Sequence, residues 1–140
     1  MKNPIQAICR EIGESGCYFL SIVRAAEERT GKTINPVAAY IEMKKKKHLG
    51  AECFVAQPDS ILSELTGIRF SVRHESKDYK AREGEVEVLR FAWKKSSGGV
   101  SMHFVLGDGC GRVAYDPLGD SYTVKHGALD SKRIFTPCKG

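Results

Sequence analysis

The sequence predicts an α+β protein in which N-terminal helices pack on a C-terminal antiparallel sheet, and three observations indicate this fold class. Apolar residues in the first half recur at the three-to-four-residue spacing of helices, whereas after residue 69 they alternate at the spacing of strands. Turn segments rich in glycine, at 96–99 and 107–111, interrupt the second half as hairpin turns do. No proline- or serine-rich linker separates the two halves, so we expect a single domain over residues 1–140.

Three helices are expected in the first half, at residues 17–29, 36–49 and 59–66. The first has Ser15 as its candidate N-cap, and Gly31 stands where a left-handed residue would end it. The second has the clearest start, because Asn35 can cap it and Pro36 suits the first helical position. We expect Gly50 to end this helix, and a glycine also follows the third.

Four strands are expected in the second half, at residues 70–72, 86–93, 100–106 and 112–116. Each combines β-branched or aromatic residues with the alternation typical of a half-buried strand. Thr123–Lys125 is a candidate for one further strand, and the polar segment 77–84 is expected to be a loop. The strands follow one another without intervening helices, which favours antiparallel pairing.

The composition is that of a soluble globular protein, with 41% apolar and 28% charged residues. No apolar run approaches the roughly 18 residues of a membrane-spanning helix, and no hydrophobic stretch follows the first residues, so we expect a cytoplasmic protein without membrane contact. Much of the net charge of +5 lies in the run 44–47, which suits a solvated helix end. The same lysines could contact nucleic acid, but no aromatic residues are interleaved with them, which argues against this partner.

Five cysteines are present, without a Cys-x-x-Cys pair or a zinc-like Cys/His spacing: Cys9, Cys17, Cys53, Cys110 and Cys138. We therefore expect free thiols and neither a metal nor an organic cofactor. Cys17 differs from the others because it stands in the first turn of an expected helix. There the unpaired N–H groups and the helix dipole favour the thiolate, which is the nucleophilic form. The alternative, which we expect for the other four, is a small buried apolar side chain.

A thiolate nucleophile needs a base, and His103 is the histidine that lies inside a predicted strand, 100–106. On that strand His103 shares a face with Val105, opposite the more apolar set that includes Phe104. If the next turn is the four residues 108–111, Gly107 pairs with Arg112 and Asp116 lies directly opposite His103. A two-residue turn would make Asp116 a diagonal neighbour on the same face, whereas an odd-length loop would move it to the other face. Asp116 can then orient the imidazole; its alternative role is a turn residue before proline.

These residues carry a resemblance to a known family. Gly-Cys-Tyr-Phe-Leu at 16–20, Met-His-Phe-Val-Leu at 102–106 and Tyr-Asp-Pro-Leu-Gly at 115–119 resemble the papain-like peptidases that cleave double-glycine leader peptides in bacteria. The resemblance implies a papain-like fold and a Cys17–His103–Asp116 triad that hydrolyses a peptide or peptidoglycan amide bond. The chain also resembles an uncharacterised group of small proteins from spirochaete plasmids and phages, which share Gly-Cys-Tyr-Phe and a segment like 52–58.

One position departs from the papain-like pattern. That family carries a glutamine five or six residues before the cysteine, whose amide donates to the oxyanion, but Glu11 stands six residues before Cys17. An ionised carboxylate cannot donate a hydrogen bond. The sequence therefore leaves two alternatives to an active hydrolase: an inactive papain-like protein that binds a peptide, and a basic nucleic-acid accessory protein.

Overall fold

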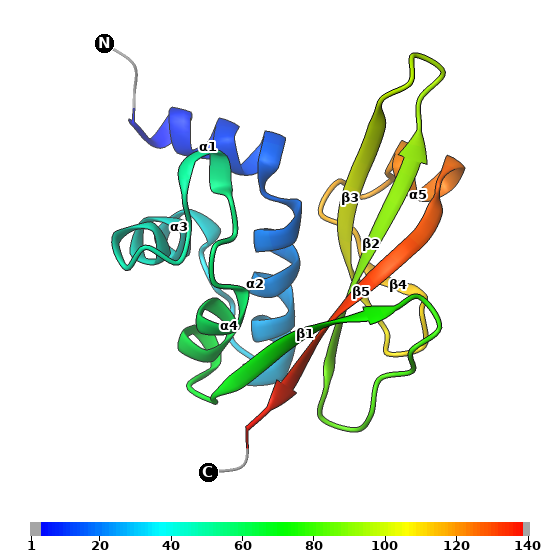
Figure 1. The fold of residues 1–140 in the computed structure, drawn as a ribbon. Helices are drawn as coiled ribbons and strands as arrows, with labels where there is room; N and C mark the ends of the chain where they lie inside the picture. Colours follow the sequence, from blue (N-terminus) through cyan, green and yellow to red (C-terminus); the bar gives the residue numbers. More distant parts are fainter. Residues whose placement is uncertain (1–3, 139–140) are drawn as a thin grey trace.

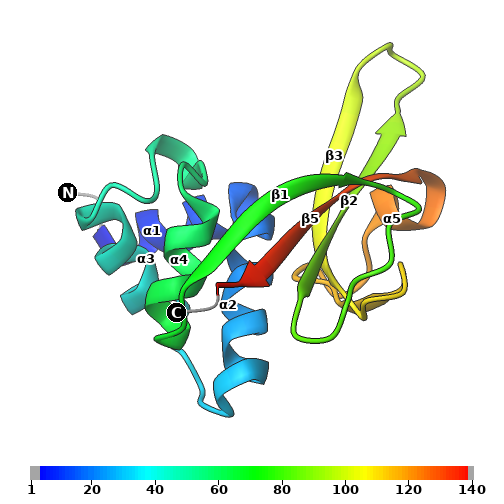
Figure 2. The same ribbon diagram turned by 60° about the horizontal axis from the view of Figure 1, so that its bottom comes forward.

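The computed structural model describes residues 4–138 and confirms the α+β class (Figure 1). The helices are α1 (Pro4–Ser15), α2 (Cys17–Thr30), α3 (Pro36–Lys45), the 3₁₀ turn η1 (Ala51–Cys53), α4 (Pro58–Thr66) and α5 (Tyr122–His126). The strands are β1 (Phe70–Ser76), β2 (Val86–Lys94), β3 (Val100–Gly107), β4 (Val113–Tyr115) and β5 (Ala128–Pro137). They form one antiparallel sheet in the order β1-β5-β2-β3-β4. Figures 1 and 2 show α1–α4 gathered on one side of the sheet, with α2 nearest to it.

The ends of α2 and α4 agree with the sequence analysis. Gly31 and Gly67 follow them in the left-handed conformation, with φ of 71° and 75°, and each donates its N–H back to the preceding turn. The start of α3 is also confirmed, because the Asn35 side chain accepts hydrogen bonds from two N–H groups of the first turn, at 2.9 and 3.1 Å. These local signals depend on few neighbouring residues, so they can be read from the sequence.

The predicted end of α3 is wrong. The helix stops at Lys45, well before Gly50, and the chain turns at Lys47 with a φ of 65°. Leu49 then pairs with Val55 in an isolated antiparallel bridge, and its side chain is 3% exposed. The turn at Lys47 lets the chain bury the Leu49 side chain, which stabilises the fold. A longer helix would instead have extended the exposed lysine run.

The sequence analysis missed α1. Ser15, expected as the N-cap of the next helix, is instead the last residue of α1, and Gly16 separates the two helices. The Gly16 N–H donates to the Ile12 carbonyl at 2.7 Å, and a Cβ at Gly16 would lie only 2.3 Å from that oxygen. Only glycine therefore allows α1 and α2 to meet at this corner without displacement of the backbone.

The C-terminal segment also differs from the prediction. Thr123–Lys125 is not a strand but the middle of the short helix α5, which begins where the Ser121 hydroxyl accepts a hydrogen bond from the Val124 N–H. The fifth strand is β5, and it lies between β1 and β2 in the sheet, as Figure 2 shows. Charged residues interrupt the alternation of β5, although two of them, Lys132 and Arg133, are buried. Their burial depends on partners from distant parts of the chain.

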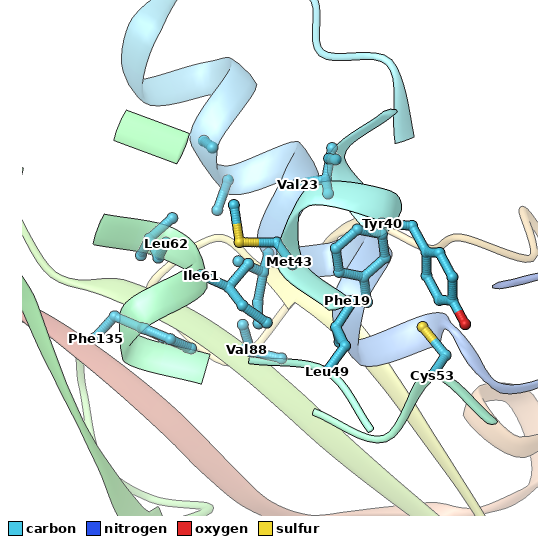
Figure 3. Packing of buried hydrophobic residues seen from close by; sticks show 14 of the residues in the cluster. Phe19, Val23, Tyr40, Met43, Leu49, Cys53, Ile61, Leu62, Val88 and Phe135 are labelled. Atoms are coloured by element: carbon cyan, nitrogen blue, oxygen red, sulfur yellow. The ribbon is translucent and has the colours of Figure 1, made fainter. Parts of the chain in front are cut away.

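The main hydrophobic core lies between the helices and the sheet (Figure 3). It contains side chains from α2, α3, α4, β2 and β5, among them Phe19, Val23, Tyr40, Met43, Ile61, Leu62, Val88 and Phe135. A second, smaller cluster of Leu89, Phe91 and Val105 packs with Val124 of α5 and with Leu129. Because neighbouring strand residues point to opposite faces, this cluster covers the face of the sheet opposite Val88. Both faces of β2 and β3 are therefore covered.

Candidate active site

Cys17 is the first residue of α2 and lies at the corner between α1 and α2. The first N–H groups of a helix have no partner within it, and they give the N-terminus a partial positive charge. The N–H of Tyr18 is one such group, and it acts to lower the pKa of the Cys17 thiol. The close approach at Gly16 holds this end of α2 in place, so the corner gives the thiol a defined position.

His103 and Asp116 lie in direct contact, as the sequence predicts. His103 Nε2 lies 2.7 Å from Asp116 Oδ1, and the two side chains are 5% and 6% exposed. The same carboxylate oxygen accepts the Leu118 N–H at 2.9 Å, which restricts the rotation of the Asp116 side chain. The imidazole is therefore held by a buried acceptor that is itself fixed by the backbone.

The register expected for this hairpin is wrong, although the contact is present. Gly107 pairs with Val113 rather than with Arg112, so the loop has an odd length. A bulge between Leu106 and Gly107 then adds one residue on β4 and restores the parity of the pairing. Asp116, directly after β4, thereby returns to the His103 side as a diagonal neighbour.

Cys17 and His103 lie close enough that each shifts the pKa of the other. Burial acts to raise the pKa of the Cys17 thiol, but hydrogen bonds from His103 and from the N–H groups of Phe104 and Tyr18 lower it below its ordinary value. Burial acts to lower the pKa of His103, but its contacts with Cys17 and Asp116 raise it. Since Nε2 faces Asp116, Nδ1 is the nitrogen left for the thiol. Both shifts favour a thiolate–imidazolium pair.

The face of β3 that carries His103 is buried. His103 shares this face with Val105, as predicted, but the face is covered by the second cluster, and His103 is 4% exposed. Its cross-strand partner is Phe91, a member of the same cluster. The apolar surroundings strengthen the electrostatic coupling of the imidazole to Cys17 and Asp116.

Glu11 has a different role from the glutamine that the resemblance implies at this position. Its Oε1 accepts the Cys53 N–H at 2.9 Å, and a hydrogen bond from the Tyr40 hydroxyl is the largest of the causes that lower its pKa. The residues of η1 that it holds, Glu52 and Cys53, have φ of 55° and 56°, a conformation rare outside glycine. Glu11 therefore ties a strained turn to α1 and does not act as an oxyanion donor.

Cys17 lies between two hollows of the surface. The larger has a volume of about 710 Å³ and its walls include Tyr18, Phe54, Phe104 and Arg133. The smaller has a volume of about 290 Å³ and its walls include His103, Pro117 and Leu118. An extended chain crossing the thiol could thus occupy both hollows, one on each side of the reacting bond.

The remaining cysteines do not share this environment. The prediction that these cysteines are small buried side chains is wrong for Cys9, Cys110 and Cys138, which are exposed. It is confirmed for Cys53, and burial is the main cause that raises the pKa of this thiol to about 12. Among the side chains that the structure describes, no three His, Cys, Asp or Glu residues are grouped to hold a metal ion.

The sequence analysis missed the walls of the larger hollow. Tyr18 and Phe104 directly follow Cys17 and His103, and their rings stack with centroids 4.3 Å apart. Their positions next to the two candidate site residues were the available signal. Arg133 gave no such signal, because β5 itself was not predicted.

The lysine run 44–47 is partly neutralised by acidic neighbours. Lys46 contacts Glu64 and lies 3.4 Å from Glu42, and Lys44 lies 3.9 Å from Glu11. These contacts reduce the positive potential that a nucleic-acid contact would need.

The fold and the site define an α+β protein with a Cys–His–Asp cluster at a helix N-terminus, in which Cys17 is half-buried and His103 is buried. The chain belongs to the family described as protein of unknown function DUF261, which matches residues 1–137. No curated protein and no solved structure matches the sequence. Within residues 4–138, no helix combines the length and the apolar character that crossing a membrane requires.

Proposed function

We propose that the protein is a papain-like cysteine hydrolase that cleaves an amide bond in a peptide or a peptidoglycan-like substrate. The observation that carries the proposal is the contact of the Cys17 thiol with His103, whose Nε2 is held by Asp116 at 2.7 Å. A nucleophile, a base and a group that orients the base are the parts that covalent catalysis by a thiol needs. The resemblance to leader peptidases supports the same assignment.

In the first half of the reaction the Cys17 thiolate attacks the carbonyl carbon of the substrate. A C–S bond forms, and the carbonyl oxygen takes up the negative charge of the tetrahedral intermediate. The backbone N–H of Cys17, in the first turn of α2, is the candidate donor to this oxygen. As the C–N bond breaks, the His103 imidazolium gives its proton to the leaving amine, and a thioester remains on Cys17.

In the second half His103, now neutral, accepts a proton from a water molecule that attacks the thioester. The C–S bond breaks, the carboxylic acid product leaves and the thiolate returns. Asp116 keeps the imidazole in one tautomer and stabilises its cationic form in both halves. These steps use groups of the chain, the substrate and water.

A thiol-directed activity probe tests the assignment together with alanine variants of the three residues. Cys17→Ala should abolish turnover and labelling, His103→Ala should nearly abolish turnover, and Asp116→Ala should be milder because Asp116 acts through the imidazole. The losses will not add, because the three residues act as a unit. Thermal unfolding of the variants is the control: a large fall in melting temperature for Cys17→Ala and His103→Ala would indicate structural roles and would overturn the enzyme assignment.

A catalytically inactive peptide-binding protein is the second candidate, and Glu11 favours it. Its carboxylate is engaged by the η1 turn, so Glu11 does not supply the missing amide donor, and the loss of one such donor costs on the order of a hundredfold in rate. A protein in which Cys17 is labelled but no peptide or peptidoglycan fragment is cleaved would support this candidate. Salt-dependent binding to DNA or RNA would instead support a nucleic-acid accessory role.

A further inference from the structure

The larger hollow beside Cys17 contains a positive charge that has no carboxylate partner among the residues that the structure describes. Arg133 extends from β5 and is 9% exposed. Among the described residues, no Asp or Glu oxygen lies within 4.0 Å of its guanidinium. Asp130 is near enough to raise the pKa of Arg133, but its carboxylate pairs with Arg90 at 2.9 Å. A desolvated guanidinium without a counter-ion is costly unless a ligand supplies one.

The hydrogen bonds of Arg133 leave part of the guanidinium unused. Nη1 donates to the Ser131 hydroxyl at 3.0 Å and to the Lys132 carbonyl at 3.4 Å. Within the described chain, Nε and Nη2 make no hydrogen bond. A guanidinium presents its donors in a planar fork that matches the two oxygens of a carboxylate.

Aromatic rings connect Arg133 to the nucleophile. The guanidinium lies over the Phe104 ring, 5.7 Å from its centroid, and Phe104 stacks on Tyr18, the residue after Cys17. His74, the cross-strand partner of Arg133, lines the same hollow. The stack gives the wall a flat apolar surface that ends at the cation.

The acidic residue that lines the hollow, Glu52, forms no salt bridge with this cation among the described residues. Its side chain is exposed, and it belongs to the η1 turn rather than to the sheet. Burial and the neighbouring Arg90 lower the pKa of Arg133 from its ordinary value, which is the direction expected where positive charge lacks compensation.

We propose that Arg133 is a specificity-determining residue that binds a carboxylate of the substrate in the larger hollow, while the aliphatic part of that substrate residue packs on the Tyr18–Phe104 stack. This rests on the proposed function, since it assigns substrate chemistry to the site of Cys17. The carboxylate is either an acidic side chain next to the cleaved bond or the free C-terminus of a short peptide.

Three matched thiol probes test the assignment: N-iodoacetyl-glutamate α-amide, N-iodoacetyl-glutamine with a free carboxylate, and N-iodoacetyl-glutamine α-amide. They carry one negative charge on the side chain, one at the C-terminus, or none. The second-order rate constant for Cys17 should be at least tenfold higher for one of the charged probes than for the neutral one. Which charged probe is favoured identifies the source of the carboxylate.

Variants assign the preference to Arg133. Arg133→Met should remove the preference for the favoured charged probe over the neutral one, and Arg133→Lys should retain part of it. Arg69→Met is the matched control, because Arg69 is exposed and forms no salt bridge within the described residues; it should keep the full preference. Melting curves verify that the variants are folded.

The experiment distinguishes failure of the proposed hydrolase function from failure of the proposed carboxylate subsite. If Cys17 does not react with iodoacetamide in the wild type, the proposed function fails. If Cys17 reacts with iodoacetamide but all three probes label it within twofold of one another, the carboxylate subsite is wrong while the hydrolase assignment stands. Equal preference in the wild type and in folded Arg133→Met would also overturn the role of Arg133, as would a preference that Arg69→Met abolishes.

Discussion

Replacing Lys132 by methionine removes one half of an ion pair that is closed from solvent. Lys132 Nζ lies 2.7 Å from Glu87 Oε1, and the two side chains are 2% and 0% exposed. The other oxygen of Glu87 accepts the N–H groups of Gly109 and Gly111, at 2.8 and 3.1 Å. The pair therefore anchors the turn between β3 and β4, after which the chain reaches Asp116.

The size of the destabilisation by Lys132→Met follows from the Glu87 carboxylate, which stays buried without its counter-ion. Removing one partner of a buried pair costs about 3–5 kcal/mol, because the other charge is left uncompensated. With an unfolding entropy of about 2.1 cal/mol/K per residue, a chain of this length should lose about 10–17 °C in melting temperature. The double variant Glu87→Gln/Lys132→Met should recover part of the loss, since a glutamine oxygen can still accept the two glycine N–H groups.

Calorimetry or circular dichroism at pH 7 measures these melting temperatures. Lys125→Met is the control, because its pair with Asp120 lies at the surface, with side chains 59% and 72% exposed. Exposed pairs contribute about 0–1 kcal/mol, so this variant should lose no more than about 3 °C. An equally small loss for Lys132→Met would refute the buried pair as the anchor of the turn.

Two further changes test how the site is positioned. Gly16→Ala should lower the free energy of unfolding by about 1–3 kcal/mol, because the new Cβ would press on the Ile12 carbonyl. The control is Gly13→Ala, which has open space around it and should be neutral or stabilise α1 by up to about 1 kcal/mol. Urea unfolding measures both changes. Glu11→Gln should make the free energy of unfolding fall less steeply in acid. Hydrogen bonding lowers the pKa of Glu11 in the folded protein, so the ionised carboxylate stabilises the fold above the ordinary carboxyl pKa of 4.5, and this stabilisation is lost as the pH falls below that value. Equal urea midpoints for the two glycine variants, or parallel acid profiles for the wild type and Glu11→Gln, would contradict these assignments.

The elements that the sequence predicts are those set by local chemistry. The cap at Asn35 and the glycine after α2 act within one turn of their own helix. β5 could not be predicted in the same way, because the burial of Lys132 depends on Glu87 and on the Tyr79 carbonyl, which come from other parts of the chain. Pattern-based prediction treats such residues as exposed, and this hides the strand.

The candidate site residues could be predicted where their residue type and their neighbours in the sequence indicate their chemistry. Cys17 follows a glycine at a helix start, and His103 lies on a strand that precedes Asp116 by one hairpin. The bulge that brings Asp116 to His103 has no signal in the sequence, so the contact was predicted from a register that the structure does not have. The sequence shows that Glu11 departs from the papain-like pattern, but its hydrogen bond to the η1 turn could be found only from the structure.

The pH dependence of alkylation at Cys17, compared between the wild type and His103→Ala, tests the central claim most directly. With iodoacetamide at pH 6, Cys17 should be labelled first, because His103 stabilises its thiolate, whereas Cys53, with a pKa of about 12, holds roughly one thiolate in a million at that pH. In His103→Ala burial would act without the imidazole, so the reaction at Cys17 should move to higher pH. Preferential labelling of Cys53 or Cys110 at pH 6, or the same profile for Cys17 in both proteins, would contradict the Cys17–His103 pair.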